Sequence, residues 1–115
     1  MAMSYEQAEA FALTLPGVTL DSSYGQLAPK VRGKPVISRS RELDSFVLRA
    51  TLEEVEMLKE SDPDCFWQTA HYEGWPCVLV RHDTADPDRL QALIERAWWD
   101  RASKKQRAER GGERP

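Results

Sequence analysis

The 115-residue sequence contains few cysteines and no long run of apolar residues. Its two cysteines, Cys65 and Cys77, are too few to build a disulfide framework, which favours a reducing compartment. No stretch approaches the roughly 20 apolar residues of a membrane helix, so we expect no membrane-spanning segment. The first residues lack the cationic and apolar run of a signal peptide, and we therefore expect a cytoplasmic protein.

The sequence also lacks an excess of positive charge, since its formal net charge is −3. This balance argues against a protein that coats nucleic acid indiscriminately. The charge is unevenly distributed, because residues 101–115 carry six basic and two acidic side chains, a net charge of +4 against −7 for residues 1–100. A local cationic surface is therefore compatible with an acidic chain.

Capping residues and apolar stripes of helical period predict three helices, at about 4–15, 51–61 and 86–102. The first two begin at capping boxes headed by Ser4 and Thr51, and the third begins at Asp86, which a proline follows. Alternating apolar residues predict strands at 18–24, within 26–41, and at 46–50, 65–69 and 76–82.

The resulting order of helix, three strands, helix, two strands and helix predicts a two-layer α+β fold. Short connections between the strands favour an antiparallel sheet, with the helices on one face. Because the length allows only one modest core, we expect a single domain over residues 1–102. We also favour a monomer. Residues 103–115 have no apolar face, so we expect a disordered basic tail.

The segment "PKVRGKPVISRSR" at residues 29–41 is rich in cations and contains no carboxylate. A hairpin turn at Gly33-Lys34 would place Val31 opposite Val36. The solvent face of this hairpin would then carry Lys30, Arg32, Arg39 and Arg41. Because Pro35 has no N–H to close a two-residue loop, a three-residue turn is the alternative.

Two interpretations of this charge remain open. Lysine and arginine on exposed strands discourage edge-to-edge aggregation, which explains many such clusters. Alternatively, the cations contact DNA phosphates and release condensed counterions. The candidate DNA-contacting residues are Lys30, Arg32, Lys34, Arg39, Arg41 and Arg49.

Aromatic residues crowd the second half of the chain, and they also have two interpretations. They pack in the core, with one ring partly exposed, or they form a partner groove or a platform that stacks an unpaired base. The second interpretation makes a protein-interaction module the main alternative to DNA binding. The candidate residues for partner contact or stacking are Trp67, His71, Tyr72, Trp75 and Trp99.

Six motifs occur in the order found in a known family. They are "LPGV" at 15–18, "SYG" at 23–25, "KVRGK" at 30–34, "FVLR" at 46–49, "HYEGWPCVLV" at 71–80 and "DPDRLQALIERAWWDRA" at 86–102. With these motifs the chain resembles the MmcQ/YjbR family of small bacterial proteins over about residues 4–102.

The resemblance implies a two-layer α/β domain with an antiparallel sheet in a double-wing arrangement, and a DNA-binding function. The positions that match the family's wing-like hairpin are Lys30, Arg32 and Lys34, with Arg49 nearby. The chain departs from the family's pattern at Pro29 and Pro35, where aromatic and apolar residues are usual, and this puts the hairpin geometry in question.

Catalytic and metal sites are not expected. The spacing of Cys65, His71, Cys77 and His82 lacks the tight cysteine pairs of structural zinc sites. No glycine-rich turn offers an oxyanion or phosphate site, and nothing marks either cysteine as activated. We therefore expect a protein that is not an enzyme and has no cofactor, with a small-molecule pocket under the "HYEGWP" loop as a third hypothesis.

Overall fold

The computed structural model describes residues 3–23, 25–82, 84 and 86–115. Its helices are α1 (Tyr5–Ala12), α2 (Leu52–Ser61), α3 (Pro87–Arg101) and α4 (Lys104–Glu109). The predicted starts of the first three are confirmed, because Ser4 and Thr51 head capping boxes and Asp86 caps α3 ahead of Pro87. No helix in this described part of the chain is both long and apolar enough to cross a membrane.

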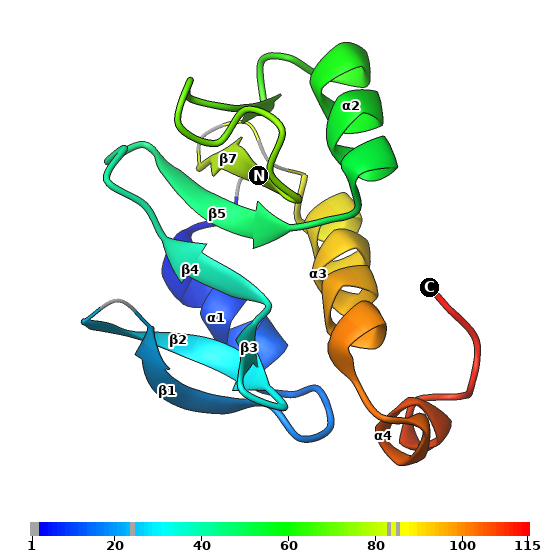
Figure 1. Ribbon diagram of the computed structural model, residues 1–115. Coiled ribbons are helices and arrows are strands. Elements are labelled where there is room, and N and C mark those ends of the chain that lie inside the picture. The colour runs from blue at the N-terminus through cyan, green and yellow to red at the C-terminus, as the bar shows by residue number, and fades with distance from the viewer. Residues whose placement is uncertain (1–2, 24, 83, 85) are drawn as a thin grey trace.

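The strands form two antiparallel sheets that lie side by side (Figure 1). The first, which we call the wing sheet, contains β1 (Thr19–Ser23), β2 (Gln26–Val31) and β3 (Lys34–Pro35) in that order. The second, the main sheet, has the order β4-β5-β7-β6. Its strands are β4 (Ile37–Arg39), β5 (Ser45–Arg49), β6 (Phe66–Trp67) and β7 (Cys77–Arg81).

Val36 joins the two sheets. Its N–H donates to the carbonyl oxygen of Pro29 in the wing sheet at 3.0 Å, and its own carbonyl accepts from the N–H of Arg49 in the main sheet at 3.1 Å. The chain bends here directly after Pro35, so one extended segment is divided into β3 and β4. Five strand segments therefore lie between the first two helices, where the sequence predicted three.

The predicted register of the basic hairpin is wrong. The turn is Arg32-Gly33, with φ angles of 53° and 77°, and it pairs Val31 with Lys34 rather than with Val36. The pair that closes such a turn exchanges two hydrogen bonds and needs both N–H groups. Lys34 supplies one of these groups, whereas Pro35 falls in the next pair, opposite Lys30, where no N–H is needed.

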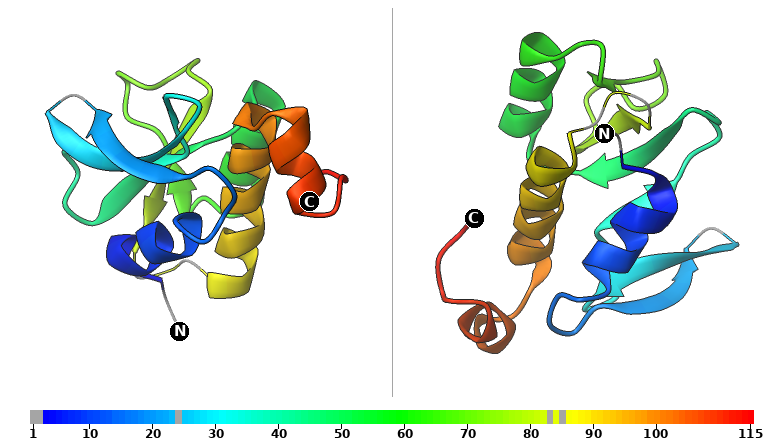
Figure 2. Two further views of the ribbon diagram at one scale, coloured as in Figure 1. Left: turned by 90° about the horizontal axis from the view of Figure 1, so that it is seen from below. Right: turned by 180° about the vertical axis from the view of Figure 1, so that it is seen from behind.

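All three long helices cover one face of the sheets. Phe46, Leu48 and Val80 of the main sheet share a buried core with residues of α1, α2 and α3. The view from behind shows α1 and α3 in front of the strands (Figure 2). This arrangement confirms the predicted α+β class with an antiparallel sheet and helices on one face.

The expected disorder of the tail is contradicted by α4, which begins at a further capping box of Ser103 with Gln106. The helix packs on the loop after α1, because a Cβ atom added to Gly17 would lie 2.1 Å from the side-chain nitrogen of Gln106. Contacts with the preceding helix replace the missing apolar face: Arg107 donates to the carbonyl of Trp99 at 2.8 Å. The C-terminus then returns beside α3 (Figure 1).

Candidate functional site

A groove of about 640 Å³ lies on the face of the main sheet opposite the helices. We call it the open-face groove. One wall is residues 26–28 of β2, and the other is the loop residues Thr69, His71, Tyr72 and Trp75. Residues 38–42 border it at the turn after β4, and Arg49 lines it at the end of β5. Thus side chains from both sheets and from the "HYEGWP" segment surround one space.

Strand alternation explains why Arg49 lies in this groove. Phe46 and Leu48 point into the helix-covered core, so Val47 and Arg49 point to the other face. Arg49 pairs in register with Cys77, whose thiol is buried. Burial raises the pKa of this thiol, and the positive charge of Arg49 opposes that rise.

The guanidinium of Arg49 has unused binding capacity. Its Nε atom is buried and has no hydrogen-bond partner among the residues that the structure describes. No ion pair within this described part of the chain involves Arg49 or Arg41. A buried donor without a partner is costly, so an anion that reached Arg49 would be stabilised.

Three rings form the loop wall of the groove. The His71 ring centroid lies 5.1 Å from that of Tyr72 and 5.3 Å from that of Trp75, and the Tyr72–Trp75 separation is 5.9 Å. Tyr72 and Trp67 both pack against the small apolar cluster that contains Val47 and Leu79. His71 and Trp75 are exposed, the latter at 45%.

Gln68, which is not among the residues predicted from the sequence, holds this loop in place. Its side-chain nitrogen donates to the carbonyl of Tyr72 at 3.0 Å and to that of Cys77 at 2.8 Å. Its side-chain oxygen accepts from Lys59 of α2 at 2.8 Å. A glutamine between an aromatic strand residue and a loop carries no pattern that distinguishes this role from ordinary surface exposure.

The six candidate cations do not share one face. Arg39, Arg41 and Arg49 all border the groove. The guanidinium of Arg39 is nevertheless turned away from it, since it lies 4.4 Å from the centroid of the Tyr5 ring and 3.5 Å from a carboxylate oxygen of Glu6. Arg39 pairs in register with the buried Phe46, so its side chain starts on the helix-covered side. Burial, together with Glu9, raises the pKa of the Tyr5 phenol to about 12.

The other three cations lie at the far end of the hairpin. The Lys30 amine donates to the carbonyl of Ser22 within the wing sheet. Arg32 is exposed in the turn, and Lys34 lines a second, smaller pocket. The predicted continuous basic face is therefore wrong, because the true register divides these side chains between separate places.

The candidate aromatic residues also lie in separate places. His71, Tyr72 and Trp75 line the groove, and Trp67 supports it by donating its ring N–H to the Ser45 hydroxyl at 3.0 Å. Trp99 lies elsewhere, on α3, where the Arg107 guanidinium sits 5.2 Å from a ring centroid.

Metal-binding chemistry is not assembled in the described part of the chain. There, no three His, Cys, Asp or Glu side chains come close enough to hold a metal ion. Both cysteines are buried as free thiols.

Comparison with protein families gives one match. The model of the family described as YjbR matches residues 13–99, which is more than half of the chain. Comparisons with curated proteins and with solved structures each give no significant match. The family match confirms the resemblance indicated by the ordered motifs.

Proposed function

The chain belongs to the YjbR family, and we propose that it is a non-enzymatic DNA-binding protein whose open-face groove holds an unpaired stretch of strand. In this proposal Arg41 and Arg49 contact phosphates, and His71 and Trp75 stack against bases. The observation that carries it is the buried, unpartnered Nε of Arg49 in a groove walled by exposed rings.

The combination of groups favours a nucleic acid over other anions. Arginine presents a planar fork of donors that matches phosphate oxygens. Aromatic rings bind unpaired bases by stacking, which tolerates any base sequence. Ser38 and Thr69 also line the groove, and their hydroxyl groups can donate to phosphate or sugar oxygens.

A salt series distinguishes this proposal from edge protection. Fluorescence anisotropy would compare a labelled single strand of about 15 nucleotides, a length that covers typical single-strand sites, with its duplex. We expect the single strand to bind more tightly, with log K falling by about 0.7 per log unit of salt for each phosphate contacted.

The variant that tests the stacking wall is Trp75→Ala. We expect it to weaken single-strand binding about tenfold while leaving the salt slope unchanged, because it removes stacking and no charge. Met57→Ala, which shortens an equally exposed apolar side chain on α2, is the control. Absence of binding even at low salt, or equal affinity of Trp75→Ala and the control, would contradict the proposal.

A small anionic aromatic ligand is the second candidate, because the same groove includes the "HYEGWP" loop residues and its volume suits such a molecule. A nucleoside monophosphate would then raise the unfolding temperature. A longer oligonucleotide would bind no more tightly than the monophosphate does.

A further inference from the structure

A second pocket, of about 260 Å³, lies where the wing sheet, the start of α2 and the end of α3 meet. We call it the corner pocket. The proposed groove function does not require it. The residues that line it are Lys34, Ala50, Thr51, Pro76, Asp100 and Arg101.

The cations of this pocket lack acidic partners. Neither Lys34 nor Arg101 forms an ion pair with any residue that the structure describes. One Arg101 nitrogen donates to the carbonyl of Ala97 at 2.9 Å. Lys34 is exposed at the mouth of the pocket, so its amine is free to move toward a ligand.

Arg49 adds positive charge beside this pocket. Burial lowers the pKa of the Arg101 guanidinium, the charge of Arg49 lowers it further, and the carboxylate of Asp100 opposes the shift. The positive charges of Arg49 and Arg101 thus disfavour each other. Such a repulsion costs stability in the free protein and is relieved when an anion binds between or beside the two groups.

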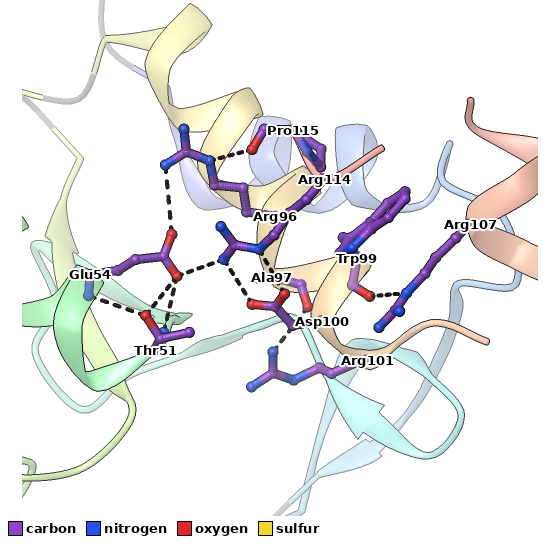
Figure 3. A network of polar contacts seen from close by, with 10 residues as sticks. All are labelled: Thr51, Glu54, Arg96, Ala97, Trp99, Asp100, Arg101, Arg107, Arg114 and Pro115. Atoms are coloured by element: carbon purple, nitrogen blue, oxygen red, sulfur yellow. Dashed lines mark hydrogen bonds and ion pairs between the residues drawn. The ribbon is translucent and has the colours of Figure 1, made fainter. Parts of the chain in front are cut away.

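The acidic residue of the pocket, Asp100, already pairs with Arg114. Both carboxylate oxygens of Asp100 accept hydrogen bonds from Arg114, at 2.9 and 3.0 Å (Figure 3). Arg114 also donates to Glu54 at 3.0 Å. Because Asp100 pairs with Arg114, it forms no ion pair with Arg101 among the described residues, although its charge still raises the pKa of the Arg101 guanidinium.

We propose that the corner pocket binds a phosphate group, with Arg101 and Lys34 as direct ligands. Arg114 acts as a positioning residue, because it holds Asp100 away from pairing with Arg101. The phosphate is either a free anion or a phosphodiester group of a nucleic-acid strand. This site stands on its own cations and does not depend on base stacking at Trp75.

The direct test is phosphate binding by the full chain, measured by ³¹P NMR titration and by thermal unfolding in phosphate and in chloride of equal ionic strength. We expect phosphate to stabilise the wild type more than chloride does. Arg101→Gln should raise the phosphate Kd about tenfold, as expected for loss of a charge-assisted contact. Arg89→Gln, on the same helix but paired with Asp62 at 3.7 Å, is the matched control.

Lys34→Gln keeps the test valid if Arg101→Gln folds poorly, because Lys34 is exposed. We expect this variant to weaken phosphate binding several-fold at unchanged unfolding temperature. Arg114→Gln should also weaken it, because Asp100 is then free to pair with Arg101. Equal stabilisation by phosphate and chloride, or the same phosphate Kd in Lys34→Gln and the Arg89→Gln control, would overturn the site.

A competition arm separates the two sources of phosphate. If an oligonucleotide displaces phosphate from the wild type, the site takes a phosphodiester group; if phosphate remains bound, the site takes the free anion. Both results support a phosphate site. Failure of the groove proposal is distinguishable, because Trp75→Ala then has no effect on oligonucleotide binding while Lys34→Gln still weakens phosphate binding.

Discussion

Residues 29–41 and residues 101–115 are both rich in lysine and arginine, yet the structure places their charges differently. In the C-terminal segment, Arg110 pairs with Glu95 at 2.9 Å and Arg114 pairs with Asp100 at 2.9 Å. Arg107 donates a hydrogen bond to the Trp99 carbonyl, and its guanidinium lies over the Trp99 ring. These three arginines are thus engaged with the domain.

The cations of the first segment are mostly unpaired. Within the part of the chain that the structure describes, Arg39 pairs with Glu6, whereas Lys30, Arg32, Lys34 and Arg41 form no ion pair. Cationic density in a sequence therefore does not indicate whether the charge is available to a ligand. Availability depends on which carboxylates the fold brings near. Glu54 of α2 and Glu95 and Asp100 of α3 lie beside the C-terminal segment, whereas Glu6 of α1 pairs only with Arg39 of the first segment among the residues that the structure describes.

Removing the C-terminal segment should change the stability of the protein more than any other change to these two regions. Truncation after Ala102 is expected to lower the free energy of unfolding by about 2 kcal/mol, the sum for a few partly exposed charged contacts and one cation–π pair. Chemical denaturation would measure the loss. An unchanged unfolding midpoint would mean that these arginines do not stabilise the domain.

Substitution of Arg32 should have a smaller and opposite effect, a rise in the free energy of unfolding. Its φ of 53° lies in the left-handed region, which costs a side-chain-bearing residue roughly 1–2 kcal/mol. After allowance for the greater freedom of glycine when unfolded, Arg32→Gly should raise the free energy of unfolding by about 0.5 kcal/mol. Arg32→Lys, which keeps both charge and Cβ, is the control and should leave stability unchanged. A loss of stability in Arg32→Gly would show that Arg32 makes contacts that support the turn.

The helices could be predicted because their signals are local. Ser4, Thr51 and Asp86 cap residues only two or three positions away, and the apolar stripes repeat within each helix. The capping box of Ser103 and Gln106 is an equally local signal for α4, but disorder was expected because the segment has no apolar face, which contacts such as that of Arg107 with Trp99 replace. The hairpin register was missed because it depends on which pair must supply an N–H, and Pro35 shifts that choice by one position.

The groove was only partly predictable. The rings of the "HYEGWP" segment and the cations of the hairpin were both named as candidates, and strand alternation was enough to place Arg49 away from the core. The sequence could not predict that these rings and cations lie around one groove. That arrangement depends on Val36 joining two sheets and on Gln68 holding the loop over the open face.

The most direct test of the account removes two arginines from each region and compares single-strand binding. Arg41→Gln/Arg49→Gln changes the groove, and Arg107→Gln/Arg110→Gln removes the same charge from the C-terminal segment. The account predicts that the groove variant loses at least about tenfold in affinity and that its salt slope falls by about 1.4, the value for two phosphate contacts. The C-terminal variant should bind within about twofold of the wild type, because its arginines contact the domain rather than the ligand. Equal losses in both variants, or a loss only in the C-terminal variant, would contradict the account.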